Sequence, residues 1–280
     1  MFNLDFESKK IKSIYGVRDS SIPFIISALL KDNNIFYIAK NDIELSDIYN
    51  FLSHNFTNIN IFKIPAWDCL PYDITSPNFN ITSERVKSFS ELSLLKNNKE
   101  INFFLTTINS LLIKTAPINF YSKNFISLTK KTECSLNKLS NFFNNSGYRR
   151  AQTVRELGEF SLRGSILDVF PIGYLNAFRI DYFDQTIETI KVMDPLSQRS
   201  SVQVENIYIY SSNEYVISEE NIEHFRKKFR SLDGINAINN PIYENVSSGI
   251  KFNGIEHFLP LLHKDPLSSI FNFLPKDLEI

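Results

Sequence analysis

Two short stretches of this sequence combine arginine, phenylalanine and acidic residues at a spacing that suits recognition of another protein. They read GEFSLRGSILDVFP (residues 158–171) and FRIDYFD (residues 178–184). Side chains of an extended strand alternate between two faces, so Arg179 and Phe183 share one face and Ile180 lies on the other. By the same rule Arg163 points away from the apolar residues of its own strand. An exposed aromatic ring beside arginines is the typical composition of a protein-interface hot spot.

A structural interpretation of the same residues stays open. Phe183 could be buried by a neighbouring helix, and the arginines could be solvated or paired within the sheet. Alternation alone favours neither interpretation. A third distinctive stretch, PAWDCLPYD at residues 65–73, contains the only tryptophan. Its prolines and aromatic residues predict a rigid turn whose rings cap the sheet.

Catalytic motifs are absent at the sequence level. A phosphate-binding loop needs glycines followed by lysine, and none of the eight glycines precedes a lysine. The segment 16–21 lies where such a loop would sit, but Asp19 would repel a phosphate there. Metal-ligand spacing is missing around all four histidines, which are His54, His224, His257 and His263. We therefore expect no catalytic, cofactor-binding or metal-binding residues in this chain.

The spacing of apolar residues along the chain predicts the helices and strands that position these stretches. In residues 1–118, apolar strands at 35–39, 59–64 and 101–107 alternate with helices at about 23–31, 42–54 and 83–96, the last capped by Ser83. This pattern predicts an α/β domain with a parallel sheet. Residues 119–205, with a helix at about 135–146 that ends at Gly147 and several short strands, predict an inserted small α+β domain. Residues 206–280 return to the first pattern with a strand at 206–210 and a helix at 219–230.

Composition bounds the class of protein. Hydrophobic residues make up 43% and charged residues 22% of the 280 residues, which indicates a folded globular chain. The formal net charge of −1 gives no broad positive field for nucleic acid. Cys69 and Cys134 form no CxxC pair, and neither a signal peptide nor a long apolar run is present. We expect a cytoplasmic protein that does not span a membrane.

Several blocks in the same order resemble the N-terminal region of bacterial transcription-repair coupling factors (Mfd). They are PAWDCLPYD, the SER of residues 83–85, GYRR at 147–150, GEFSLRGSILDVFP, FRIDYFD and MDPLSQRS at 193–200. The excision-repair protein UvrB is similar more loosely, but it has a phosphate loop and a DNA-clamping hairpin that this chain lacks. The resemblance implies a UvrB-like α/β domain with a degenerate nucleotide fold, divided into residues 1–118 and 206–280. The second part is apparently shorter than in the family.

The resemblance also implies a function. The family's inserted domain binds the repair protein UvrA, and its contact positions fall on Arg163, Arg179 and Phe183 of this chain. RNA polymerase and DNA bind other domains of the full-length family, whose ATP-dependent translocase motor lies outside this chain. We therefore expect a non-catalytic adaptor that recruits UvrA, without a cofactor of its own. The alternatives are part of an ATP-dependent DNA enzyme, or a degenerate scaffold without a surviving partner.

Overall fold

The computed structural model describes residues 14–30, 34–95, 101–232, 239–275 and 278. The chain divides into two compact units, each described by itself. The first consists of residues 1–66, 95–113 and 274–280, and the second of residues 67–94 and 114–273. Our predicted domain boundaries at 118 and 205 stay predictions.

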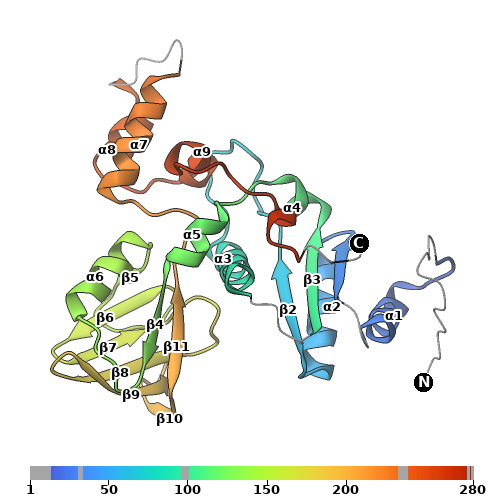
Figure 1. Cartoon of the computed structure of the whole chain (residues 1–280), viewed down its shortest axis with the longest axis horizontal. Coiled ribbons are helices and arrows are strands. Elements are labelled where there is room, and N and C mark those ends of the chain that lie inside the picture. Colours follow the sequence, from blue (N-terminus) through green and yellow to red (C-terminus); the bar gives the residue numbers. More distant parts are fainter. Residues whose placement is uncertain (1–13, 31–33, 96–100, 233–238, 276–277, 279–280) are drawn as a thin grey trace. The chain divides into compact units, whose positions relative to one another are not determined.

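The first unit is a three-stranded parallel sheet with helices (Figure 1). Its described elements are η1 (Asp19–Ser21), α1 (Ile22–Leu29), β1 (Ile35–Ala39), α2 (Asp42–Asn55), β2 (Ile59–Ile64), β3 (Ile101–Thr107) and α4 (Ile108–Leu112). The strand order is β1-β3-β2, so β3 is central, with Phe103 and Leu105 fully buried. These side chains pack with α1 and α2. The predicted parallel α/β sheet is confirmed; positions 31 and 96, where two predicted helices end, lie outside the described residues.

Local signals explain where α2 begins. The Asn41 side chain accepts the backbone N–H of Glu44 at 2.9 Å, which satisfies one unpaired donor of the first turn. Asp42 and Glu44 place negative charge at the same helix end, where the helix dipole favours it. The apolar residues Leu45, Ile48 and Leu52 then repeat at helical spacing and are all buried.

The second unit contains a mostly β part and a helical part. Its described elements are α3 (Phe79–Leu94), α5 (Ile118–Lys123), β4 (Phe125–Thr129), α6 (Leu136–Asn145), β5 (Arg149–Arg150), β6 (Glu159–Arg163), β7 (Ile166–Val169), β8 (Ala177–Phe183), β9 (Thr186–Met193), β10 (Ser200–Val204), β11 (Asn206–Tyr210), α7 (Glu219–Arg230), α8 (Pro241–Ser247), η3 (Ile255–Phe258), α9 (Leu259–Leu262) and η4 (Ile270–Asn272).

The helix α3 begins earlier than predicted, so Ser83 as its cap was wrong. Asn78 accepts the backbone N–H of Asn80 at 2.9 Å and therefore occupies the capping role. Ser83 lies inside the helix, where its hydroxyl donates to the carbonyl oxygen of Phe79 at 2.7 Å. Because its hydroxyl bonds to the preceding turn, this serine can lie in the interior of a helix and does not mark the start of one.

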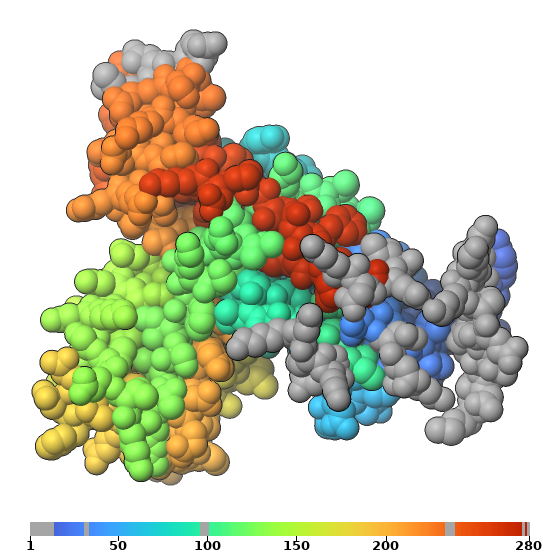
Figure 2. Space-filling model, in the orientation of Figure 1, coloured from blue at the N-terminus to red at the C-terminus, as the bar shows by residue number. Residues whose placement is uncertain are grey.

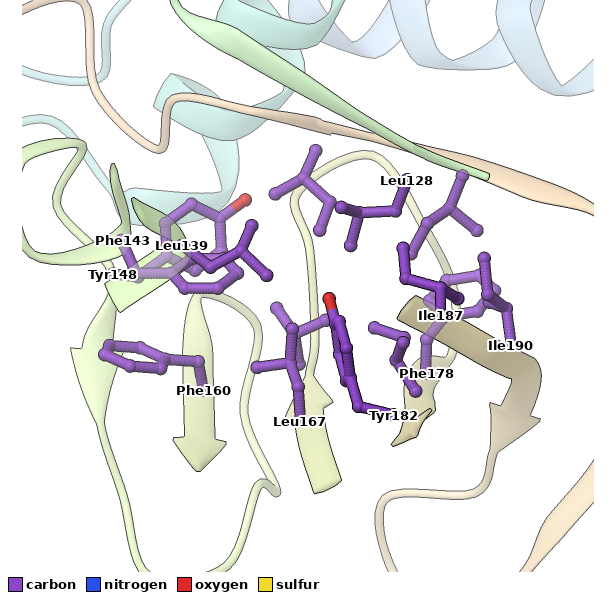
Figure 3. Packing of buried hydrophobic residues seen from close by; sticks show 14 residues of the cluster. Leu128, Leu139, Phe143, Tyr148, Phe160, Leu167, Phe178, Tyr182, Ile187 and Ile190 are labelled. Atoms are coloured by element: carbon purple, nitrogen blue, oxygen red, sulfur yellow. The ribbon is translucent and has the colours of Figure 1, made fainter. Parts of the chain in front are cut away.

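The β part has two sheets. Strands β5 to β10 form a six-stranded sheet in the order β10-β9-β8-β7-β6-β5, antiparallel except for the β5–β6 pair. Strands β4 and β11, about 80 residues apart in the chain, form a separate antiparallel pair (Figure 1). Side chains from both sheets and from α6 meet in one core, as Figure 3 shows for Leu128, Leu139, Phe160, Phe178 and their neighbours.

In the helical part, α7 packs with α8 and α9 around the buried Phe225 and Phe229. Figure 2 shows the red atoms of α9 beside the orange atoms of α7. Trp67, predicted to cap a sheet, packs against this helical cluster, and its ring meets His257 edge-on at 5.7 Å between centroids.

A fully buried ion pair ties distant segments of the second unit together. Arg85 of α3 donates through Nε to Glu214 Oε1 at 2.8 Å, and neither side chain is exposed. The other oxygen, Glu214 Oε2, accepts the hydroxyl of Thr115 at 2.8 Å. The pair therefore joins α3 to the segments before α5 and after β11.

Candidate protein-binding face

The six-stranded sheet has two different faces. Phe178, Ile180 and Tyr182 of β8 point into the core and are at most 4% exposed, as alternation predicts. Between them, Arg179 and Asp181 point to the outer face. This outer face contains the residues predicted to recognise a partner.

A shared carboxylate holds the two predicted arginines. Asp168 of β7 pairs in register with Arg179 of β8, and its side chain is fully buried. Arg179 donates through Nε to Asp168 Oδ1 at 2.7 Å and through Nη2 to Oδ2 at 2.8 Å. Arg163 of β6 donates through Nη2 to the same Oδ2 at 2.5 Å. These hydrogen bonds raise the pKa of Arg179, although its partial burial opposes the shift.

The arginines keep donors available to a partner despite this shared contact. The Arg163 side chain is 51% exposed and that of Arg179 is 23% exposed. A guanidinium has five N–H donors in a rigid planar fork, and the contact to Asp168 uses one donor of Arg163 and two of Arg179. Guanidinium groups of this kind bind carboxylates with charge-assisted hydrogen bonds.

A second ion pair lies beside the first on the same face. Asp181 accepts the hydroxyl of Thr189 at 2.6 Å and the ammonium of Lys191 at 3.0 Å, all through Oδ2. Burial raises the pKa of Asp181, but the hydrogen bonds from Thr189 and Lys191, together with the positive charges of Lys191 and Arg179, lower the pKa below its ordinary value. With Arg163, Arg179 and Asp168, this pair leaves one positive charge in excess.

Phe183 is the exposed apolar group of this face. It ends β8, pairs in register with Thr186 of β9, and is 78% exposed. A strand spacing of about 4.8 Å and a rise of about 3.4 Å per residue put its Cα about 12 Å from that of Arg163, two strands away. We call the surface formed by Arg163, Arg179 and Phe183 the open patch.

The other end of the outer face is covered. Val154, from the loop before β6, packs with Ala177 and Met193 of the sheet. Gln198, in the loop before β10, donates through Nε2 to the carbonyl of Val154 at 2.8 Å, and its own carbonyl lies 3.4 Å from Arg179 Nη1. Arg179 therefore marks the border between the covered end and the open patch.

The structure resolves the two interpretations of these residues in part. Phe183 is exposed, whereas the arginines are paired within the sheet through Asp168. Sequence reasoning missed this aspartate as their partner. The signal was an acidic residue between the buried Leu167 and Val169 of a strand, because a carboxylate at such a position needs a cation on the neighbouring strand.

Among the described residues, no helix has the length and apolar character needed to cross a membrane. That part of the chain also contains no group of three or more potential metal ligands drawn from histidine, cysteine and acidic residues.

Comparison with known proteins places this face in a family domain. Residues 126–215 match the model of the UvrB interaction domain. Over 253 residues, 90% of its length, the chain is 32% identical to the transcription-repair-coupling factor of Rickettsia bellii, and covers 22% of that protein. It is 30% identical to that of Escherichia coli over 220 residues, 79% of the chain and 19% of the relative. The chain thus spans about a fifth of the length of the curated relatives that it matches.

Proposed function

Because the chain matches the N-terminal region of transcription-repair coupling factors and contains their UvrB interaction domain, we propose that it is a non-catalytic adaptor that recruits UvrA. In the longer protein it would bring nucleotide excision repair to RNA polymerase stalled at DNA lesions in the bacterial cytoplasm. Contacts with RNA polymerase and DNA, and the ATP-driven translocase motor, would belong to other regions. The open patch is the observation that carries this proposal.

The chemistry of the open patch suits a protein partner. A partly exposed arginine held in place binds a carboxylate or carbonyl without losing much further side-chain entropy. Phe183, exposed at the end of its strand, can fill an apolar pocket. Arginines and aromatic rings of this kind contribute much of the binding energy of protein interfaces.

The region before α1 supports a non-catalytic role. Asp19, in the position where a phosphate-binding loop would lie, accepts the ammonium of Lys40 at 2.6 Å. The nearby lysine is therefore engaged by a carboxylate of the chain itself. A nucleotide phosphate would have to displace this contact and approach a negative charge.

Alanine variants of Arg163, Arg179 and Phe183 test the proposal. We expect each to weaken UvrA binding by about 2 kcal/mol, roughly thirtyfold, because truncating a hot-spot residue costs at least this much. Arg163→Ala and Phe183→Ala should change the free energy of unfolding by only about 0.5 kcal/mol, because both side chains are exposed. Arg179→Ala also removes the bidentate partner of the buried Asp168 and should cost about 3 to 5 kcal/mol, so its UvrA affinity is measured on the folded fraction. The measurement is a calorimetric titration with UvrA beside a urea unfolding curve for each variant.

Ile180→Ala is the matched control on the opposite face of the same strand. Ile180 is fully buried, so its truncation should lower the free energy of unfolding by about 2 to 5 kcal/mol and leave UvrA binding intact in the folded fraction. If all three outward variants bind UvrA like the unchanged chain, the adaptor proposal fails.

A further inference from the structure

Asp168 is a fully buried carboxylate at the base of the open patch. It sits on β7, between the strands of the two arginines, and contacts both of them. Among the described residues, neither arginine donates a hydrogen bond to any other carboxylate. The position of Asp168 therefore determines where both guanidinium groups lie.

We infer that Asp168 is a positioning residue of the partner-binding surface, which fixes the guanidinium plane of Arg179 and anchors one nitrogen of Arg163 so that both groups can bind UvrA. This inference rests on the proposed function and deepens it. Asp168 itself lies beneath the surface and does not touch the partner. It acts through the arginines.

The geometry explains how one carboxylate can orient two arginines. The bidentate contact uses Nε and Nη2 of Arg179, which fixes the plane of that guanidinium. The contact to Arg163 uses only Nη2 of that arginine, so its Nε and Nη1 do not bond to Asp168. Without the carboxylate, both side chains would sample several rotamers, and a partner would have to order them on binding.

Whether UvrA affinity falls or rises when the charge of Asp168 is removed distinguishes a positioning role from a purely electrostatic one. Asp168 places a negative charge under two cations that are to meet acidic or carbonyl groups of the partner. If only net charge mattered, removing this charge would strengthen the attraction of the patch for a carboxylate. If positioning matters more, removing it weakens binding although the patch becomes more positive.

The test is Asp168→Asn in the 280-residue chain, titrated with UvrA. The amide keeps the size of the side chain but loses the charge and one acceptor oxygen. We expect binding to weaken about tenfold, the usual consequence of disordering a charge-assisted contact. In a variant that already contains Arg163→Ala and Arg179→Ala, adding Asp168→Asn should cause no further loss of UvrA binding, because Asp168 acts through these two residues.

Asp181→Asn is the matched control. It removes a carboxylate from the same face and the same sheet, but one whose hydrogen bonds go to Thr189 and Lys191. We expect its UvrA affinity to stay within about threefold of the unchanged chain, because neither arginine loses a hydrogen bond.

The hydrogen bond between Arg179 and Asp168 can also be measured directly, without UvrA. The Nε–H group of Arg179, which donates to Asp168, should give a protected NMR signal in the unchanged chain that Asp168→Asn abolishes. Should Asp168→Asn fail to fold, Asp168→Glu serves the same purpose, because it keeps the charge and moves the carboxylate by one methylene. Weaker binding by this variant supports positioning.

The outcomes distinguish the inference from the proposed function. If alanine at Arg163, Arg179 and Phe183 leaves UvrA binding unchanged, the proposed function fails and the inference with it. If those variants weaken binding while Asp168→Asn binds equally well or more tightly, the inference alone is overturned. Unchanged UvrA binding by a folded Asp168→Glu variant overturns it likewise.

Discussion

At the scale of single residues, Asp181 makes the stability of the β part depend on pH. Its folded-state pKa lies below the unfolded value of 3.8: burial raises the pKa, but the hydrogen bonds from Thr189 and Lys191 and the charges of Lys191 and Arg179 together lower it by more. A carboxylate with a depressed pKa stabilises the folded state above its unfolded pKa, and this contribution is lost as the pH falls through the folded pKa.

We therefore expect Asp181→Asn to lower the free energy of unfolding at pH 7 and to lose this difference in acid, below about pH 4. The comparison is between urea unfolding curves of the two chains from pH 7 to pH 3, so that other titrating groups cancel. A difference that stays constant over this range would mean that the charge of Asp181 contributes nothing to folding.

The same scale shows what one sequence can and cannot reveal about the binding face. Alternation placed Ile180 in the core and Phe183 outside, because a strand has only two faces. It could not reveal that Asp168 holds Arg163 and Arg179, because that contact depends on which strands are neighbours and in which register. The predicted UvrA contacts themselves stay predictions.

At the scale of elements, Gly147 ends α6 with a backbone that other residues rarely adopt. Its φ is +94°, and a Cβ there would lie 2.5 Å from the hydroxyl oxygen of Ser212 and would also collide with the side chain of Asn213. Ser212 cannot easily yield, since it is buried and donates to the carbonyl of Ser146 at 2.8 Å.

We expect Gly147→Ala to lower the free energy of unfolding by about 3 kcal/mol or more, through left-handed strain and overpacking together. Gly164→Ala is the control, because Gly164 also has a positive φ, +60°, but open space around its Cβ position. It should cost only the strain, about 1 to 2 kcal/mol. Equal losses in thermal or urea unfolding would show that the contact with Ser212 is unimportant.

Elements with strong local signals were predictable from the sequence. The three strands of the parallel sheet, β11 and α7 have the predicted limits, since apolar runs and capping residues determine them locally. The start of α3 was missed because a serine inside a helix and a serine at its cap look alike in sequence. The pairing of β4 with β11 was invisible for another reason: its partners are about 80 residues apart.

At the scale of the molecule, this pairing bears on where the inserted domain ends. β11 pairs with β4 at five positions, and Ile207 and Ile209 of β11 belong to the core of the β part. We expect a fragment of residues 119–215 to melt cooperatively and at a higher temperature than one of residues 119–205, because only the longer fragment buries these side chains. Calorimetry of the two fragments measures this difference. Equal melting temperatures would favour a boundary at 205.

The ion pair between Arg85 and Glu214 also affects the order in which segments of the chain can fold during synthesis. The two residues are 129 positions apart in the sequence. Because a ribosome adds about 5 to 20 residues each second, Glu214 is synthesised on the order of ten seconds after Arg85. Burying the charge of Arg85 alone would be costly during this interval. We therefore expect α3 to remain undocked on the nascent chain until residue 214 has been synthesised, and protease sensitivity of chains arrested before and after that point would reveal the change.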